Sequence, residues 1–395
     1  MKLNLTIHPR LRIGIFPLIL IFLMGIAVVV AMVRYSLGIG AISDLSNSYS
    51  WAFWVSFDLY TGIAISSGAF LLASIVYIFE MEQFRPLLRP TLLTGFLGYL
   101  MEVIALMVDL GHPERIWHYF VYQNFTSFLL VIGLYVMIYL VVLLLEFSPA
   151  LFERFKWNNL NRFIKRFMKP LVIIGAVISI LHQGALGGLM LIEPTKLHTL
   201  WWTPIIQVLF IISAIAIGLA MTIFESSVSS RYFKRGLETH LLDKLAKFIP
   251  YVLGLYALVK FGDLTFAGDL RYLFASDLMS ILFWLEILIS IVIPAVLFSI
   301  KQVRQSSKGL LIGSIVLLLG MILNRFNISW FAVKHYDPMQ YVPSFMSKVN
   351  YFPTLPEVAI SIGIFSAGIL AFGLAVKYLP VFESEHQEAQ TPSGD

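Results

Sequence analysis

Long apolar runs, separated by short polar and often basic segments, dominate the chain. A helix that crosses a bilayer needs roughly 20 mostly apolar residues, and ten runs are long enough. The predicted spans are 13–33, 56–79, 91–108, 126–147, 171–192, 203–224, 248–266, 278–300, 310–330 and 357–379. The ninth is the least regular, because Asn324, Arg325 and Asn327 interrupt it. The pattern predicts an all-α, polytopic integral membrane protein, with one membrane domain of about ten transmembrane helices over residues 1–382.

The composition supports a membrane protein and excludes two other classes. Of the 395 residues, 58% are hydrophobic and 13% are charged, about half the usual charged share of a soluble domain. Disordered chains are polar and poor in aromatic residues, so a disordered chain is excluded. The basic residues form short clusters between apolar runs, which argues against nucleic-acid binding. The polar, acidic segment 383–395 is predicted to be a disordered cytoplasmic tail.

Basic residues give the expected orientation. The first run follows Lys2, Arg10 and Arg12, as a signal peptide would, but it is longer than a typical signal core and lacks a clear cleavage site. We therefore expect it to be retained as a span, so that ten spans put both termini on one side. That side carries 20 of the 28 Lys and Arg residues. Because positive loops stay in the cytoplasm, both termini are predicted to be cytoplasmic.

The chain has no cysteine, which excludes disulfides, thiolate catalysis and iron–sulfur ligation within it. Any iron–sulfur cluster must therefore sit on a partner. Haem b is a poor fit as well, because only His182 lies well inside a predicted span. No metal-ligand spacing is present, so we predict no metal site.

Ionisable groups at membrane depth are costly, and each is a functional hypothesis. Helix rise and direction place most of them in the outer half of the bilayer: Asp58, Glu102, Asp109, His182, Lys260, Asp263, Asp277, Glu286 and Arg325. They could form internal ion pairs, such as Lys260 with Glu286 or Asp263 with Arg325, or line a polar cavity that opens outward. Near the inner ends, Glu146 and Glu225 could pair with the abundant Lys and Arg or take up protons.

Most tryptophans also lie on or near the outer side. They are Trp51, Trp54, Trp117, Trp201, Trp202, Trp284 and Trp330. An interfacial aromatic belt would explain them, although a belt normally covers both faces of the membrane. A docking surface for another protein is the alternative.

The segment ILHQGALGG is the most informative stretch. His182 and Gln183 precede Gly184, Gly187 and Gly188, and small residues let a flat ring or another backbone approach a helix closely. Imidazole can donate a hydrogen bond to a quinone carbonyl and pass a proton to it. The alternative is a histidine that only packs.

The chain resembles the membrane subunits of the NrfD/polysulfide reductase family, in their HybB- and DsrP-like ten-span branch. The resemblance covers nearly the whole chain. It rests on SDLSNSYSWAFWVSFDLYTGIAISSGAF, RPTLLTGFLGY, LEFSPALFERF, HQGALGG, KLHTLW, IFES, FGDL, FWLEIL and AVKYLPVF. The combination is specific, although no single motif suffices.

The resemblance implies a quinone-interacting subunit of a multi-subunit oxidoreductase of anaerobic respiration, in a prokaryotic cytoplasmic membrane. Such a protein holds no haem or cluster. It exchanges electrons between an outer-face, ferredoxin-like iron–sulfur subunit and menaquinone or ubiquinone, and it is not an enzyme alone. Further partners are a hydrogenase, a sulfur-metabolism complex or a multihaem cytochrome, together with membrane lipid. The direction of electron flow stays open.

Together, the residues and the resemblance predict two sets of site residues. The predicted quinone-binding residues are His182, Asp58, Asp109, Asp263 and Glu102. The predicted proton pathway consists of Glu146, Glu225, Glu286 and Arg325. Relatives commonly carry a glutamate where this chain has Val131, so any proton translocation needs a different path, such as one through Glu102. A secondary transporter and a passive membrane anchor are the alternative functions.

Overall fold

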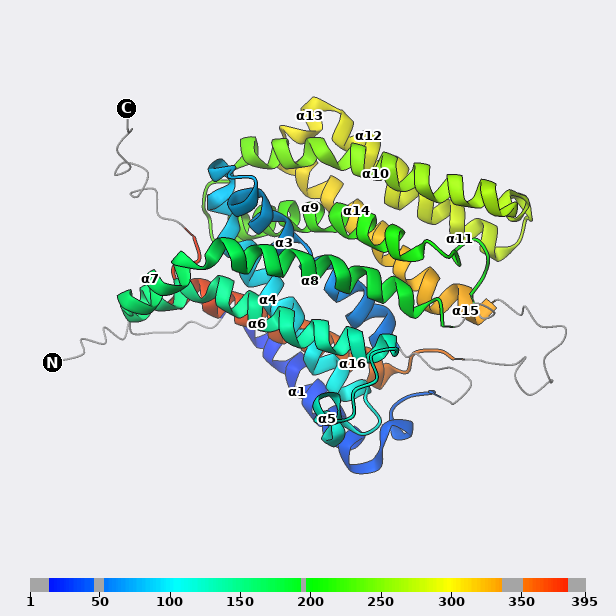
Figure 1. The fold of residues 1–395 in the computed structure, drawn as a ribbon, viewed down its shortest axis with the longest axis horizontal. Coiled ribbons are helices and arrows are strands. Elements are labelled where there is room, and N and C mark those ends of the chain that lie inside the picture. The colour runs from blue at the N-terminus through cyan, green and yellow to red at the C-terminus, as the bar shows by residue number, and fades with distance from the viewer. Residues whose placement is uncertain (1–13, 46–52, 193–196, 336–350, 383–395) are drawn as a thin grey trace.

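The computed structural model describes residues 14–45, 53–192, 197–335 and 351–382, and every regular element within these ranges is a helix (Figure 1). Ten helical segments are long and apolar enough to cross a membrane, as the sequence predicts. Their bounds are Ile15–Leu37, Val55–Ile78, Glu82–Asp109, Phe128–Phe155, Met168–Leu189, Ile206–Tyr232, Thr239–Ala267, Leu278–Ser299, Ser307–Phe331 and Leu355–Tyr378. The predicted tail 383–395 lies outside the described residues.

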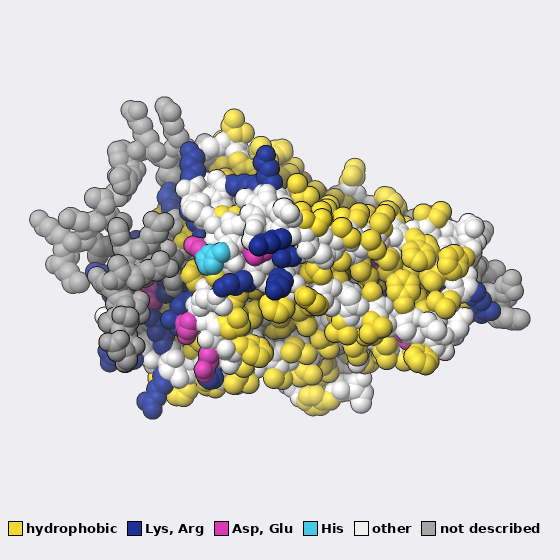
Figure 2. All heavy atoms as spheres, turned by 90° about the horizontal axis from the view of Figure 1, so that it is seen from above, with side chains coloured by type: hydrophobic (Ala, Val, Ile, Leu, Met, Phe, Trp, Pro, Cys, Tyr) yellow, Lys and Arg dark blue, Asp and Glu magenta, His cyan; other side chains and the backbone are white. Residues whose placement is uncertain are grey.

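The end of the molecule that the charge pattern assigns to the cytoplasm is called the inner end below, and the opposite end the outer end. Figure 2 shows one face on which Lys and Arg side chains gather toward one end, while hydrophobic side chains cover much of the remainder. A hydrophobic surface of this kind can face lipid.

The helices form two groups around a central helix, α9 (Ile206–Tyr232). The second to fifth spans pack on one side of α9, and the seventh to ninth spans pack on the other. The outlying pair α1 (Ile15–Leu37) and α16 (Leu355–Tyr378) pack on each other, and α16 joins them to α4 (Arg85–Asp109). Within an apolar 18-residue window of each helix, 72% of the residues of α9 are buried inside the protein, but only 11% of those of α1 are buried.

Small residues explain the central position of α9. In the absence of a hydrophobic driving force between helices in lipid, close packing of small residues holds membrane helices together. Gly218 of α9 faces Gly68 of α3 (Gly68–Ala73) so closely that a Cβ on Gly218 would lie 2.8 Å from the Gly68 nitrogen. A larger residue at either position would push α3 away from α9.

Several spans contain wide turns with π-helical hydrogen bonding, which accommodate an extra residue and often occur at functional sites. These turns are η2 (Val55–Gly62), η3 (Ser74–Ile78), η7 (Leu288–Val292) and η8 (Asn327–Phe331). Asp58 lies within η2, and η7 begins two residues after Glu286. The wide turns therefore adjust the direction of side chains close to the buried charges.

Among the spans that reach farther toward the inner end than the apolar runs predict are three that contain a proline in the helix interior. The third begins at Glu82 instead of 91, the fourth ends at Phe155 instead of 147, and the seventh begins at Thr239 instead of 248. Each continues through a proline, respectively Pro90, Pro149 and Pro250. Membrane helices tolerate proline because neighbouring groups satisfy the backbone atoms it frees, so neither proline nor polar character ends these helices.

Candidate functional site

His182 is the centre of the first cluster of buried polar groups. It lies on α8 (Met168–Leu189) and is 0% exposed. Its Nδ1 is 3.0 Å from the hydroxyl of Tyr99 on α4, and its ring centroid is 6.2 Å from that of Tyr135 on α6 (Phe128–Phe155). The other ring nitrogen, Nε2, is buried and has no hydrogen-bond partner among the described residues. One nitrogen is therefore held by the protein, and the other remains available to a ligand.

A groove of about 390 Å³ lies against the neighbouring face of α8, where Leu181, Gly184 and Ala185 line it and His182 does not; its volume is within the range of small-molecule sites. Its walls come from α6, α8, α9 and the loop before α6. The lining residues are Phe125, Thr126, Ser127, Phe128, Val131, Tyr135, Ile180, Leu181, Gly184, Ala185, Gln207, Val208 and Ile211. The Tyr135 ring lines the groove and also approaches His182, so it joins the two.

The groove opens on the lipid-facing side of the protein. Leu181 and Val208 line it and are 48% and 46% exposed. At Gly184, the nearest atom that an added Cβ would meet is the Ile211 Cδ1, at 3.5 Å. Gly184 thus leaves space at the groove wall, whereas Gly187 and Gly188 pack closely against Gln207 and Phe128. Val131 makes the α6 wall of the groove apolar.

Two carboxylates of the first cluster are incompletely satisfied. Asp58 Oδ2 accepts a 2.7 Å hydrogen bond from Ser361 of α16, but Oδ1 has no partner among the described residues. Glu102 is 2% exposed, and neither of its oxygens has a partner within the same ranges. Glu102 lies close enough to Asp58 and Tyr99 for their charges to interact. The structure thus brings Asp58, Glu102 and His182 into one polar region.

Arg34, which directly follows the first predicted span, is a buried part of this region. It is 4% exposed on α1 and donates to the carbonyl oxygens of Val108, at 2.7 Å, and Leu110. These two carbonyls flank Asp109, which lies near both Arg34 and Glu357 of α16. Asp109 is therefore placed at the outer rim of the first cluster, with a cation beside it.

Toward the inner end, tyrosines connect His182 to Glu146. The Tyr99 ring packs edge-on against Tyr139, with centroids 4.8 Å apart. A Cβ added to Gly175 would lie 2.9 Å from Glu146 Oε1 and 3.5 Å from the Tyr139 ring. Because Gly175 carries no methyl group, a small space remains between Glu146 and Tyr139. Glu146 Oε2 is buried and has no partner among the residues that the structure describes.

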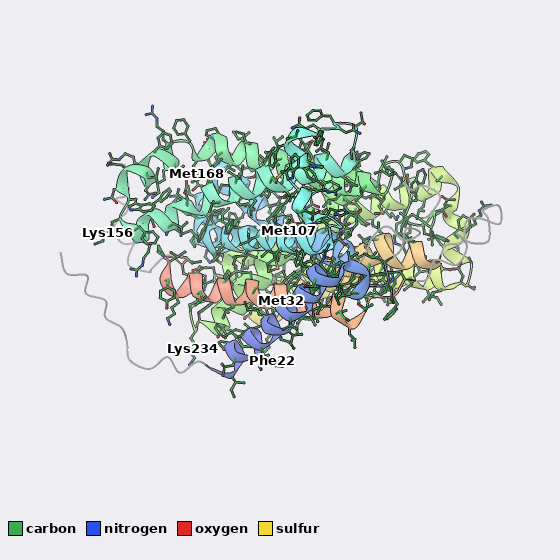
Figure 3. All side chains as sticks on the ribbon, turned by 90° about the horizontal axis from the view of Figure 1, so that it is seen from below. Phe22, Met32, Met107, Lys156, Met168 and Lys234 are labelled. Atoms are coloured by element: carbon green, nitrogen blue, oxygen red, sulfur yellow. The ribbon has the colours of Figure 1, made fainter. Side chains whose placement is uncertain are left out.

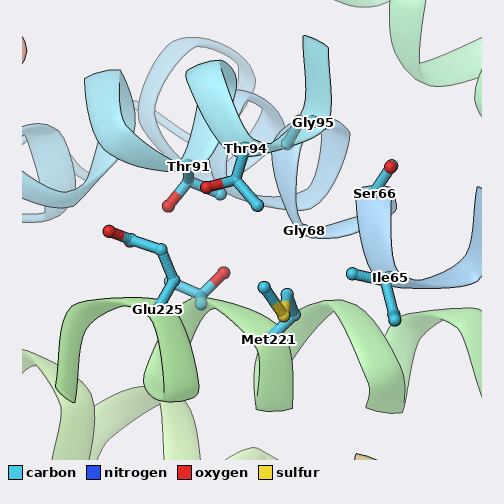
Figure 4. A pocket seen from close by; sticks show the side chains of 10 residues that line it. Ile65, Ser66, Gly68, Thr91, Thr94, Gly95, Met221 and Glu225 are labelled. Carbon is cyan, nitrogen blue, oxygen red and sulfur yellow. The ribbon is translucent and has the colours of Figure 1, made fainter. Parts of the chain in front are cut away.

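Glu225 lies on α9 beside a separate, small space. Figure 4 shows its side chain pointing toward Thr91, across from Thr94 on the same helix. This cavity measures about 10 Å³, close to the room that a single water molecule needs. The Thr94 hydroxyl is buried without a partner in the described ranges, so a water there would find polar neighbours.

Glu286 belongs to a second cluster, in the other group of helices, and its carboxylate is well satisfied. It accepts hydrogen bonds from Trp201 Nε1 at 2.7 Å, Asn324 Nδ2 at 2.7 Å and Asn327 Nδ2 at 2.6 Å. The same Asn324 Nδ2 also donates to the Tyr256 hydroxyl oxygen, at 3.3 Å. A buried network satisfied in this way fixes the relative positions of its helices.

The cations of the second cluster bind neutral groups. Arg325 donates to Ser213 Oγ at 2.7 Å and to the neighbouring Asn324, and its guanidinium lies 3.9 Å from the Phe210 ring centroid. Lys260 donates to a backbone carbonyl, and Asp263 accepts from Thr203. Neither of the expected ion pairs, Lys260 with Glu286 or Asp263 with Arg325, forms among the described residues. The charges lie near one another but are held by hydrogen bonds to uncharged partners.

Outside the spans, the loop between α8 and α9 holds His198 beside the second cluster. Its Nδ1 accepts a 3.2 Å hydrogen bond from the Leu200 amide. Burial lowers the pKa of His198 below its ordinary value, because a buried site disfavours the charged imidazolium. The neutral ring is the form that can accept this bond.

The predicted site residues thus fall into separate places. His182, Asp58, Glu102 and Asp109 share the first cluster, whereas Asp263, Glu286 and Arg325 share the second. Glu146 and Glu225 lie toward the inner end, on different helices. No group of three His, Asp or Glu side chains suited to a metal ion occurs in the described part of the chain.

Several partners of these residues escaped the sequence analysis. Tyr99 lies one helical turn before Glu102, so its position on the same face was detectable. Ser361 binds Asp58 across 303 positions of sequence, for which the linear pattern holds no signal. The tryptophans do not form one outer surface either, because Trp54 and Trp201 are 1% exposed while Trp117 is 50% exposed. Trp51 lies outside the described residues.

Comparisons with known proteins agree with the resemblance seen in the sequence. The family described as "Polysulphide reductase, NrfD" matches residues 41–332. The "Probable Ni/Fe-hydrogenase 2 b-type cytochrome subunit" of Escherichia coli is 30% identical over 91% of this chain and 92% of its own length. The "Menaquinone reductase, integral membrane subunit" of Nitratidesulfovibrio vulgaris is 26% identical, with coverages of 88% and 87%. "Protein NrfD" of Escherichia coli is 25% identical over 71% of this chain and 94% of its own length.

Proposed function

The chain belongs to the NrfD polysulphide reductase family, and from this premise we propose that it is the quinone-reactive membrane subunit of a respiratory oxidoreductase. It exchanges electrons between an iron–sulfur partner on the outer face and menaquinone or ubiquinone. One relative is named a menaquinone reductase subunit. The observation that carries the proposal is the unpartnered Nε2 of His182, buried behind a groove that opens to lipid.

The groove suits a lipid-soluble ring. Exposed apolar side chains such as Leu181 and Val208 form its mouth, so a hydrophobic carrier can enter without passing through water. Gly184 leaves the α8 wall of the groove flat, and Tyr135 lines the part of the groove nearest to His182. Quinone supplies the two-electron, two-proton redox chemistry when bound. The residues of this chain orient the ring and handle its protons.

Tyr99 determines which proton His182 offers. If the Tyr99 hydroxyl donates to Nδ1, the imidazole hydrogen sits on Nε2 and can be donated to a carbonyl oxygen. When Nε2 gives up that proton, Nδ1 takes the proton of Tyr99. The imidazole therefore remains neutral, and Tyr99 regains its proton from the inner side in the same transfer, because a buried tyrosinate would be as costly as a charged ring.

Protons reach this pair from the inner side along the tyrosines. Glu146 takes up a proton, and Tyr139 and Tyr99 carry it to His182. Glu225, with the water-sized cavity beside Thr94, supports a second route along α4 to Glu102. Neither route uses position 131, so the valine there does not block proton uptake. Glu286, Arg325 and Asp263 remain predictions, and their hydrogen-bonded surroundings favour a positioning role.

An exposed aromatic loop supports a partner at the outer end. Trp117, Phe120, Tyr122 and Phe125 are 50%, 63%, 67% and 69% exposed in the segment before α6. Phe125 also lines the groove, so a protein that covers this loop would sit next to the bound ring. We propose a ferredoxin-like iron–sulfur subunit at this place. The assembly lies in a prokaryotic cytoplasmic membrane, with both termini of this chain in the cytoplasm.

Replacing His182 with alanine tests the proposal. Membranes carrying the assembled complex should lose quinone-linked electron transfer, and the purified chain should retain less quinone, because the only group presented by His182 to the ring is gone. His240→Ala is the matched control, since His240 is exposed at the inner end. If the His182→Ala variant keeps its activity and its quinone content, the proposal is wrong and the chain acts as a passive membrane anchor. Solute uptake with no quinone dependence would establish a transporter.

A further inference from the structure

A short helix at the inner end, α7 (Asn158–Arg166), presents an apolar stripe that the protein covers only at Ile164, which packs against the core. Leu160, Phe163, Ile164 and Phe167 follow the spacing of one helical face. Leu160, Phe163 and Phe167 are 42%, 58% and 48% exposed. A helix of this pattern in a soluble domain would bury its stripe against the core.

Basic side chains lie around the stripe. They are Arg154, Lys156, Arg162, Lys165, Arg166 and Lys169, and all are exposed. Lys165 is 3.1 Å from a carboxylate oxygen of Glu153, and Lys169 is 2.6 Å from Glu80. The other four have no carboxylate partner among the described residues, so their positive charge is not neutralised within this chain.

Aromatic side chains extend the apolar surface at the start of α7. Phe155 and Trp157 stack with centroids 5.4 Å apart and are 59% and 55% exposed. Figure 1 shows α7 at one end of the molecule, between α6 and α8. Figure 3 places Lys156 and Met168, which flank α7, at that same end. Since α6 and α8 both span the membrane, α7 lies at the level of the bilayer surface.

Two simpler explanations cover only part of these observations. Basic residues in a last helical turn interact favourably with the helix dipole, but this applies to Lys165 and Arg166 alone. The retention of basic loops in the cytoplasm explains the charge but leaves the exposed stripe uncovered. An interfacial helix explains both, because its apolar face enters the boundary of the acyl chains and its basic residues meet the headgroups.

We propose that α7 and its flanking residues form a binding surface for anionic phospholipid of the inner leaflet. The stripe of Leu160, Phe163 and Phe167 contacts acyl chains, and Arg162 and Arg166, which flank the stripe on the Phe163 side of the helix, bind headgroup phosphates. Charge complementarity favours this occupant, because each basic residue near an anionic leaflet strengthens binding about fivefold. The proposal does not depend on the quinone site.

The test compares lipid binding by two double variants of the full chain in neutral detergent. Arg162→Gln/Arg166→Gln removes two charges from the surface, and Lys301→Gln/Lys308→Gln removes two exposed charges elsewhere at the inner end. Native mass spectrometry titrates phosphatidylglycerol against phosphatidylcholine on each protein. We expect the first variant to bind phosphatidylglycerol roughly 30-fold more weakly than wild type, with the control unchanged and phosphatidylcholine binding equal in all three.

Equal phosphatidylglycerol affinity in the two variants would overturn the proposal. So would displacement of the lipid by inorganic phosphate, which would indicate a site for a soluble anion. Should the arginine variant fail to fold, the wild-type protein still decides the matter. Its affinity for phosphatidylglycerol should fall with added salt, while a salt-independent affinity would contradict a role for these charges.

Discussion

Removing one hydroxyl should separate proton handling at His182 from the packing around it. In Tyr99→Phe, the ring that packs on Tyr139 at 4.8 Å is retained. Only the 3.0 Å contact with His182 Nδ1 is lost. That nitrogen then becomes a buried polar atom without a partner, and the tautomer with hydrogen on Nε2 is no longer enforced.

The size of the effect follows from that lost partner. Leaving a buried acceptor unsatisfied costs about 1–3 kcal/mol, and each 1.4 kcal/mol corresponds to about tenfold in rate. We therefore expect quinone-linked turnover of the assembled complex to fall roughly 5- to 150-fold. The assay measures the rate with a short-chain quinone, together with the quinone extracted per mole of chain. Turnover should fall more than quinone content does.

Tyr256→Phe provides the matched control for this experiment. Tyr256 is also buried, and its hydroxyl is 3.3 Å from the Asn324 amide in the second cluster. If both variants lower turnover equally, the loss reflects a general loosening of the helices. Unchanged turnover in Tyr99→Phe would show that the tyrosine takes no part in proton transfer.

Three further predictions concern other parts of the molecule. Gly175→Ala should place a methyl group against Glu146 and slow the proton uptake that accompanies turnover in proteoliposomes, with quinone binding retained; undiminished uptake would contradict the tyrosine route. Glu286→Gln should lower the melting temperature, because each hydrogen bond from a neutral donor to a carboxylate contributes about 1.5–3 kcal/mol and an amide NH2 would face one of the donors Trp201, Asn324 and Asn327; an unchanged melting curve would contradict that role. His198 has a lowered pKa in the folded state, so the unfolded chain binds its proton first and stability should decline as the pH falls below about 6.5. His198→Asn, which can still accept from Leu200, should reduce that decline in melting experiments from pH 8 to 5, and an identical slope would exclude His198 as its source.

The sequence was sufficient to predict the ten spans because twenty apolar residues in succession have few alternatives to a membrane helix. It was less informative about helix ends, since polar inner extensions and prolines such as Pro149 continue the helices. The wide turns left no signal, because their extra residue is accommodated by packing between helices and not by local sequence preference.

The candidate site was predicted as a set of residues but not as an arrangement. Charges inside apolar runs identify Asp58, Glu102 and His182 directly from the cost of burying them. Their partners, such as Ser361, come from helices far away in the sequence and are set by the tertiary fold. The expected ion pairs failed for the same reason, because an amide or hydroxyl from a neighbouring helix can take the place of an opposite charge.

At Val55–Gly62 the backbone carries surplus length relative to a regular α-helix. Shortening the chain by one residue there would let the turn tighten while the inner half of the span stays in place. The same deletion in the middle of α9 would rotate every later side chain by about 100°. Evolution can therefore insert or delete a position beside Asp58 without disturbing the remainder of the helix, whereas α9 admits only substitutions.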